Sequence, residues 1–192
     1  FRIPYKQMPL DENFRLKIDD YKGENGGIVF PNPNAPTGIY ESLDHVEEII
    51  KNNPDVIVIV DEAYIDFGGE TALPLIDKYD NLVVVRTFSK SRSMAGLRIG
   101  YAISSMAGMR IGFAIGNQRL IRALNDVKYS YNSYTMNRPS LVLGVESIHD
   151  DAYFREKVGQ IIATRERFVK EIAELGFTCL PSSANFVFAT HE

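Results

Sequence analysis

The sequence predicts an α/β fold in which a mostly parallel β-sheet is flanked by helices. Three short apolar runs, at 27–30, 56–60 and 82–85, have the length and composition of β-strands. The run at 56–60 contains only valine and isoleucine, which is typical of a strand buried on both faces of a parallel sheet. A helical pattern separates the first two runs, and a connecting segment around 73–79 separates the last two. This order favours right-handed crossovers within one sheet.

The first predicted strand and helix are bounded by residues that favour turns and caps. The run at 27–30 ends in a loop over 31–38 that is rich in proline, asparagine and glycine. Ser42 is placed to cap a helix whose apolar residues fall on one face, namely Leu43, Val46, Ile49 and Ile50. The Asn-Asn-Pro sequence at 52–54 is expected to end this helix.

The C-terminal half predicts two further helices and two strands. Asn117 is placed to cap one helix, and the longest helix is expected from about 150 to 175, with Gly176 where a helix end favours glycine. Segments 177–180 and 185–190 are predicted as strands of a different, α+β piece. We therefore expect one domain over 1–140 and, over 141–192, a connecting helix with the start of a second domain.

The composition excludes several classes of protein. The 192 residues are 45% hydrophobic and 24% charged, as in an ordinary globular domain, and the net charge of −4 argues against nucleic-acid binding. No apolar run approaches the ~20 residues of a membrane span, and no signal peptide is visible. The single cysteine and three scattered histidines predict neither a disulfide nor a metal cluster. We expect a cytoplasmic enzyme domain and, because the chain opens at Phe1 without methionine, a fragment.

Two adjacent blocks of twelve residues repeat one another. The block 93–104 (SMAGLRIGYAIS) is followed at once by 105–116 (SMAGMRIGFAIG), and the two blocks match at nine positions. Two units are too few for a solenoid. A local duplication or insertion is the simplest interpretation. The alternative is that either copy can fill one and the same strand.

Three groups of polar residues follow the predicted strands. They are 34–38 (Asn-Ala-Pro-Thr-Gly), 61–64 (Asp-Glu-Ala-Tyr) and 87–90 (Thr-Phe-Ser-Lys). Ligands of parallel sheets bind beyond the carboxyl ends of the strands, where these groups are expected to lie. Asp-Glu after a strand also occurs in magnesium sites of nucleotide-binding proteins, but no phosphate-binding glycine-rich loop precedes it here. Each group alone is weak evidence; together they predict one ligand site.

The three groups, in this order, resemble those of the fold type I aminotransferases, which use pyridoxal 5′-phosphate (PLP). The similarity extends over nearly the whole chain and is strongest to the histidinol-phosphate aminotransferases. It rests on 33–38 (PNAPTG), 61–67 (DEAYIDF), 86–90 (RTFSK) and 95–101 (AGLRIGY). A lysine and an arginine eight residues apart, Lys90 and Arg98, make the set specific for the superfamily.

The resemblance implies roles for the residues around the cofactor ring. Lys90 is expected to form the covalent link to PLP and to carry a proton between substrate and cofactor carbons. Asp61 is expected to keep the ring nitrogen protonated, and Tyr64 to donate to the phenolic oxygen. Ala63 is small enough for the ring to lie against the strand end. No metal is implied.

The resemblance also implies which residues bind the cofactor phosphate. Thr87 and Ser89 offer hydroxyl groups, and Arg98 offers a guanidinium fork. Relatives contact the phenolic oxygen from an asparagine directly before Pro-Thr-Gly, where this chain has Ala35. We expect Asn34, one residue upstream, to take that contact.

The resemblance gives the duplicated block an expected register. Relatives need one arginine eight residues beyond the lysine, and Arg98 of the first copy meets that spacing, whereas Arg110 of the second lies twenty residues beyond Lys90. Filling the strand from the second copy would place twelve extra residues beside the cofactor. We therefore expect the first copy to form the strand and the second to form a surplus segment, which could also pair at a sheet edge of an identical chain.

The function implied by the resemblance is transamination. A parent enzyme would exchange an amino group between a small-molecule donor, L-histidinol phosphate, and 2-oxoglutarate, as a homodimer without nucleic-acid or membrane partners. Two alternatives stay open within the superfamily: an aminotransferase for aromatic amino acids and a threonine-phosphate decarboxylase. A third is a non-catalytic binding or folding module that holds PLP weakly or not at all.

Overall fold

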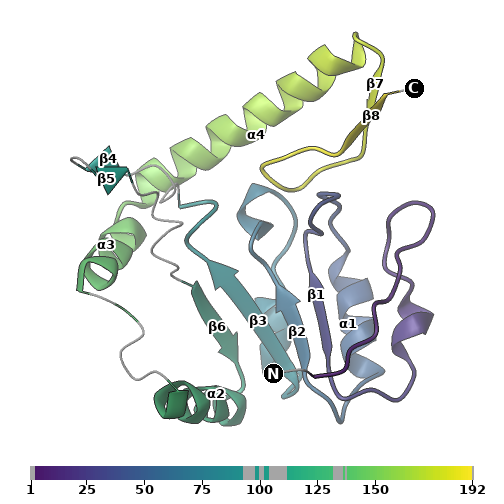
Figure 1. Ribbon diagram of the computed structural model, residues 1–192, viewed down its shortest axis with the longest axis vertical. Helices are drawn as coiled ribbons and strands as arrows, with labels where there is room; N and C mark the ends of the chain where they lie inside the picture. The colour runs from purple at the N-terminus through teal and green to yellow at the C-terminus, as the bar shows by residue number, and fades with distance from the viewer. Residues whose placement is uncertain are drawn as a thin grey trace.

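The computed structural model describes residues 3–92, 98–99, 102–103, 112–131, 136 and 138–191 (Figure 1). Its main sheet has the strand order β1-β2-β3-β6. These strands are β1 (Ile28–Pro31), β2 (Val58–Asp61), β3 (Leu82–Thr87) and β6 (Gly112–Gly116). The first three are parallel, and β6 runs antiparallel to β3. The predicted mostly parallel α/β sheet is therefore confirmed.

The hydrophobic core lies between this sheet and helix α1 (Leu43–Lys51). Alternate strand residues point to one face, where Phe30, Val60 and Val84 are buried against the fully buried Val46 and Ile49 of α1. The short helices η1 (Ile18–Tyr21) and η3 (Leu73–Asp77) add partly buried side chains to the core.

Ser42 caps α1 as predicted, because its Oγ accepts a hydrogen bond from the His45 N–H at 3.4 Å.

Coverage of the sheet is uneven in the described part of the chain. The expectation that the second strand is buried on both faces is only half met. On the face opposite α1, Ile59 is half-buried, and its neighbour Val29 on β1 is 69% exposed.

Strand β6 comes from the second copy of the duplicated block. Gly112 lies opposite Thr87 and Gly116 lies opposite Val83. The first copy instead contributes β4 (Arg98–Ile99) and β5 (Ala102–Ile103), which pair with each other in a separate two-stranded ladder. Our expectation that the first copy fills the strand and the second is surplus is therefore wrong.

The link on the C-terminal side of the strand gives a physical reason for this register. Gly116 is followed at once by Asn117, whose Oδ1 accepts a hydrogen bond from the Arg119 N–H at 2.8 Å, at the start of α2 (Gln118–Tyr131). Asn117 Nδ2 also donates to the Asp80 carboxylate at 2.5 Å, just before β3. With the first copy in the sheet, twelve residues would intervene between the strand and this cap. The spacing to Lys90 alone does not decide the register.

Three elements after α2 follow the sequence prediction in part. The longest helix is α4 (Asp151–Ala173), capped by Asp150, and Gly176 has a φ of +88° just beyond its end, as predicted. Both predicted strands are present, as β7 (Phe177–Cys179) and β8 (Ala189–His191), and they pair with each other, but β8 is shorter than the segment 185–190 and lies at its end. Ser182 Oγ donates to the Phe186 carbonyl at 2.6 Å, so a turn replaces the first half of that segment.

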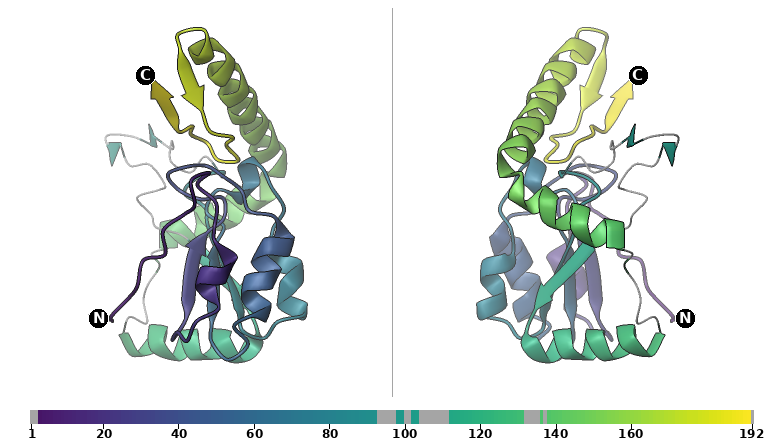
Figure 2. Two further views of the ribbon diagram at one scale, coloured as in Figure 1. Left: turned by 90° about the vertical axis from the view of Figure 1, so that its right-hand side faces the viewer. Right: turned by 90° about the vertical axis from the view of Figure 1, so that its left-hand side faces the viewer.

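Helix α3 (Arg138–His149) was not predicted, because its segment was assigned to a domain boundary. Pro139 is its second residue, a position where proline needs no intrahelical donor. Figure 1 and Figure 2 show α4 and the β7–β8 hairpin beyond the carboxyl ends of the parallel strands, with α2 at the opposite end. Within the described residues, no helix combines the length and the apolar character that a membrane span requires. The division at 140 stays a prediction.

Candidate active site

The predicted site residues lie where the parallel strands end. Asp61 is the last residue of β2, opposite Pro31 of β1 and Val85 of β3. Its Oδ1 accepts a hydrogen bond from the Ala63 N–H at 3.0 Å, which shapes the turn that leads to Tyr64. Within the described part of the chain, Asp61 makes no ion pair. The residue is half-buried at the edge of the sheet.

The structure brings Lys90 and Tyr64 together, as the sequence predicted for one site. Lys90 Nζ lies 5.0 Å from the centroid of the Tyr64 ring, a cation–π arrangement. Phe186 approaches the same ring edge-on, with centroids 5.0 Å apart and an interplanar angle of 87°. Among the described residues, no carboxylate lies within ion-pair distance of Lys90 Nζ. Among the described residues, the neighbour of this amine is thus an aromatic ring and not a carboxylate.

The residues expected at the phosphate and the phenolic oxygen are engaged in local turns. Thr87 Oγ1 accepts a hydrogen bond from the Ser89 N–H at 3.1 Å. Asn34 Oδ1 accepts from the hydroxyl of Thr37 at 2.8 Å, so its carboxamide oxygen faces its own loop. These bonds fix the loops after β1 and β3. The expected contacts of Asn34, Thr87 and Ser89 with a cofactor stay predictions.

The side chain of Arg98, expected at the phosphate, lies outside the described residues, and so does Arg110. The spacing argument for Arg98 depended on the first copy filling the strand, and β6 removes that support. Its role as a phosphate ligand stays a prediction from the resemblance.

A buried ionic cluster behind the site was missed at the sequence level. The Glu62 side chain is 1% exposed and accepts hydrogen bonds from Arg86 Nε and Nη2 at 3.0 and 2.9 Å. It also accepts from the Thr71 hydroxyl at 2.7 Å and the Ala72 N–H at 2.6 Å. All four bonds satisfy one buried carboxylate, so Glu62 has a structural role while its neighbour Asp61 stays free of ion pairs among the described residues.

Asp66 extends this cluster toward the lysine. Its Oδ1 lies 3.7 Å from Arg86 Nη1, and its Oδ2 accepts a hydrogen bond from the Ser91 hydroxyl. Asp66 lies in the short helix η2 (Ile65–Phe67), directly after Tyr64 and Ile65. Both acids and Arg86 belong to the motifs already noted, but nothing in their spacing reveals that they meet. Phe186 was also missed, because it is far from Tyr64 in sequence.

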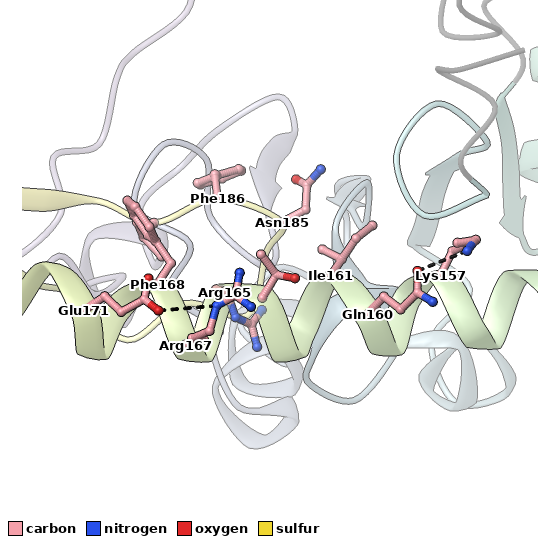
Figure 3. Close-up of a pocket in the computed structure, with 11 residues that line it drawn as sticks. Lys157, Gln160, Ile161, Arg165, Arg167, Phe168, Glu171, Asn185 and Phe186 are labelled. Atoms are coloured by element: carbon pink, nitrogen blue, oxygen red, sulfur yellow. Dashed lines mark hydrogen bonds and ion pairs between the residues drawn. The ribbon is translucent and has the colours of Figure 1, made fainter. Parts of the chain in front are cut away.

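Arg165 links helix α4 to two segments near the site. Arg165 Nη1 donates to the carbonyl oxygens of Phe67 at 3.2 Å and Ala184 at 2.6 Å, so it links α4 to η2 and to the turn before Phe186. An open groove of about 540 Å³ lies beside this link, lined by α4 and by 185–187 (Figure 3). Of the residues named above, the groove contains only Arg165 and Phe186. Because Asp61, Tyr64 and Lys90 do not line it, we place the site at the strand ends.

The comparison with protein families matches residues 2–191 to one family. The model of aminotransferase class I and II matches residues 2–107 and, separately, residues 103–191. The two matches meet inside the duplicated block, so the chain aligns to the family in two pieces, each with its own copy.

About half of the aligned residues are identical between this chain and its curated relatives. The chain is 50% identical over 191 residues to a histidinol-phosphate aminotransferase of Lactococcus lactis subsp. cremoris, and 51% identical over 193 residues to that of Brachyspira hyodysenteriae. Each alignment covers 100% of this chain but only 50% and 51% of the relative. The chain thus spans about half the length of these relatives.

Solved structures of similar fold include three of particular interest. A putative histidinol-phosphate aminotransferase from Erwinia carotovora atroseptica has a TM-score of 0.79 at 25% identity, covering 95% of this chain and 52% of that one. A histidinol-phosphate aminotransferase from Sinorhizobium meliloti, in complex with pyridoxal-5′-phosphate, has a TM-score of 0.71 at 26% identity, covering 85% and 42%. A decarboxylase from Sulfurospirillum multivorans has a TM-score of 0.74 at 25% identity, covering 96% and 53%.

Proposed function

Because the chain belongs to the aminotransferase class I and II family, we propose that a protein containing it transfers an amino group between L-histidinol phosphate and 2-oxoglutarate, with PLP as cofactor. The relatives at about half identity are histidinol-phosphate aminotransferases, which supports this amino donor over others. The Sinorhizobium meliloti relative holds PLP, which supports the cofactor.

The chemistry of the described side chains fits PLP. Asp61 offers a carboxylate without an ion pair among the described residues, and Lys90 offers an amine without an acid partner there. Tyr64 lies between Lys90 and Phe186 and offers a hydroxyl group. An anion, an amine and a phenol within one aromatic-lined corner are the groups that a protonated pyridine ring, an aldehyde and a phenolate require.

Each of these side chains has a definable task in the proposed reaction. When bound, PLP supplies an electron sink for the carbon–hydrogen bond that is broken beside the substrate nitrogen. Lys90 Nζ would hold the cofactor covalently and, once released by the substrate amine, would carry the proton from the substrate carbon to the cofactor carbon. Asp61 would keep the ring nitrogen protonated, and the Tyr64 hydroxyl would donate to the phenolic oxygen. Ala63 leaves space beside the strand end.

The phosphate contacts complete the proposal. Thr87 is the last residue of β3, and Ser89 lies in the loop that follows, directly before Lys90. We assign the phosphate to this strand end and loop, with Arg98 as the cationic ligand from the resemblance, and we assign Asn34, on the loop after β1, to the phenolic oxygen. Removing the Ser89 hydroxyl is expected to weaken cofactor binding, whereas removing the Thr87 hydroxyl would also break its hydrogen bond with the Ser89 N–H.

The observation that carries the proposal is the lysine amine over Tyr64 at the end of a parallel sheet whose neighbouring strand ends in Asp61. The test is covalent trapping. The chain is mixed with PLP, reduced with borohydride and mapped by peptide mass spectrometry. We expect the label on Lys90 and its loss in Lys90→Ala, whereas Lys170→Ala on α4 serves as the control that keeps it. A label spread over surface lysines would instead favour a non-catalytic module.

The amino donor requires a separate assay on the protein with both halves present. Turnover is compared for L-histidinol phosphate, an aromatic amino acid and threonine phosphate. Preference for the aromatic donor, or release of carbon dioxide from threonine phosphate, would contradict the proposed substrate while leaving the cofactor assignment intact. The similarity to a decarboxylase fold makes the second comparison necessary.

We also infer that the protein acts in the cytoplasm as a homodimer on small-molecule substrates. Helix α3 carries four half-exposed aliphatic side chains within the described residues, namely Leu141, Val142, Val145 and Ile148, which supports contact with further protein. Light scattering of the protein with both halves present tests the dimer, and a monomer at assay concentration would contradict it.

A further inference from the structure

The residue directly after the proposed reactive lysine is buried and hydrogen-bonded. Ser91 is 1% exposed, and its hydroxyl donates a hydrogen bond to Asp66 Oδ2. A hydroxyl so deeply buried needs such a partner, because water cannot replace it. The bond fixes the backbone from which Lys90 projects.

Asp66 is itself held by the ionic cluster behind the site. Arg86 Nη1 lies 3.7 Å from Asp66, and the same guanidinium donates two hydrogen bonds to Glu62. Glu62 is bonded in turn to Thr71 and Ala72. The acceptor of the Ser91 hydroxyl therefore belongs to a network that spans the ends of β2 and β3 and the loop beyond η2.

The same short segment also carries the ring beneath the lysine amine. Tyr64 and Asp66 are separated by one residue, and η2 begins directly after Tyr64. One end of the segment contacts Lys90 Nζ through the ring, at 5.0 Å, and the other end binds the hydroxyl of Ser91. The segment 64–66 thus contacts the lysine amine through the Tyr64 ring and binds the residue that follows Lys90 through Asp66.

We propose that Asp66 is a positioning residue for Lys90, acting through the Ser91 hydroxyl to hold the lysine amine over Tyr64. The expected effect on reactivity rests on the function proposed above, since only a reactive lysine needs this placement. Its geometric part concerns Lys90, Ser91 and Asp66 alone and does not require a cofactor. A small displacement of a reacting group costs rate steeply, up to roughly 100-fold per ångström.

A merely structural hydrogen bond would behave differently. If the Ser91–Asp66 bond only closes a turn, its loss would lower the melting temperature and leave the lysine amine over the ring. Stability alone therefore cannot distinguish the two interpretations, and the position of Lys90 Nζ has to be measured.

The first measurement is NMR of the chain after reductive ¹³C-methylation of its lysine amines. The Lys90 methyl signal is assigned by its absence in Lys90→Arg. We expect an upfield ring-current shift for this signal, which Tyr64→Leu removes. Ser91→Ala and Asp66→Ala are expected to move it toward the signals of exposed lysines. Ser130→Ala, which removes an exposed hydroxyl bonded to the Asp126 carbonyl, is the matched control and leaves it unchanged.

Two further variants keep the test decisive. Asp66→Asn retains an oxygen acceptor for the Ser91 hydroxyl and is expected to retain the shift, even if Asp66→Ala unfolds. The double variant Ser91→Ala with Asp66→Ala is expected to displace the signal no further than either single variant, because both remove one interaction. An unmoved Lys90 signal in folded Ser91→Ala would overturn the proposal.

The second measurement links the position to reactivity. Borohydride trapping of PLP at Lys90 is expected to slow about tenfold or more in Ser91→Ala, with little change in Ser130→Ala. Trapping at an unchanged rate in Ser91→Ala would also overturn the proposal. If the unaltered chain traps no PLP at all, the proposed function fails, whereas the NMR comparison still decides whether Asp66 positions the lysine.

Discussion

Replacing Gly116 by serine tests why the second copy of the duplicated block forms β6. The first copy carries Ser104 at the matching position, so this substitution removes the difference between the copies there. A Cβ atom at 116 would lie 2.9 Å from the Leu82 carbonyl oxygen and 3.4 Å from Val83 Cγ2. Because the carbonyl belongs to the backbone of β3, it cannot rotate away, and the two strands have to separate locally.

The neighbouring glycine shows why position 116 is the informative one. A Cβ at Gly112 would lie 2.8 Å from the Arg86 carbonyl oxygen, so this end of the strand also excludes a side chain. The first copy has Gly100 at the matching position, however, and meets that requirement equally well. Among the two glycines of β6, only Gly116 distinguishes the copies.

The size of the effect follows from this close contact. Overpacking of a tightly packed site costs about 1–3 kcal/mol, which corresponds to roughly 5–150-fold in the balance between two registers. For a chain of this length, we expect Gly116→Ser to lower the melting temperature by about 2–12 °C. Ser104→Gly alone removes the obstacle from the first copy and is expected to leave the melting temperature nearly unchanged.

Cysteine pairs report which copy lies beside β3. Val85 lies opposite Ala114 in the sheet, and Ala102 is the matching residue of the first copy. With Cys179 changed to serine, Val85→Cys with Ala114→Cys is expected to form a disulfide, because directly opposed antiparallel residues have suitable spacing. Val85→Cys with Ala102→Cys, the matched control, is expected to stay reduced.

The swap of the two residues should reverse this preference. In a chain with Gly116→Ser and Ser104→Gly, cross-linking is expected to shift from position 114 toward position 102, as counted by free thiols and mass spectrometry. Equal cross-linking of both pairs in the unaltered background would refute a single register. An unchanged preference after the swap would refute Gly116 as its determinant and leave the cap at Asn117 as the deciding contact.

Three further predictions follow from separate parts of the molecule. Asp61→Asn keeps the shape of the side chain but removes its charge, so PLP should still bind while proton removal from the substrate slows severely; a near-normal turnover rate would make the carboxylate structural. Ile49→Ala empties a fully buried position and should cost about 2–5 kcal/mol in chemical denaturation, whereas the 43% exposed Ile57→Ala should cost much less; equal losses would contradict the assigned core. The Tyr79 hydroxyl donates to Glu47 at 2.7 Å, which lowers the pKa of Glu47 and raises that of Tyr79. The stabilisation linked to Glu47 is therefore present above its usual pKa and lost as the pH falls through its lowered value, so the melting-temperature difference between Tyr79→Phe and the unaltered chain should shrink in acid. A difference that persists at low pH would exclude this linkage.

The sequence alone was sufficient for features that depend on neighbouring residues. The apolar run around Val58, the cap at Ser42 and the glycine at Gly176 are local signals, because strand propensity, capping and a positive φ are decided within a few residues. The motifs that carry Asp61, Tyr64 and Lys90 could be recognised for the same reason. Local signals also placed these residues at one edge, since parallel strands end together.

Tertiary structure decided what depends on contacts between distant segments. The two copies match at nine of twelve positions, and the fit of Gly116 against β3 and of Asn117 at the start of α2 distinguishes them. The ring of Phe186 against Tyr64, and the hydroxyl of Ser91 against Asp66, likewise join residues whose spacing carries no signal. Close packing and buried hydrogen bonds are satisfied in three dimensions, and no periodicity along the chain records them.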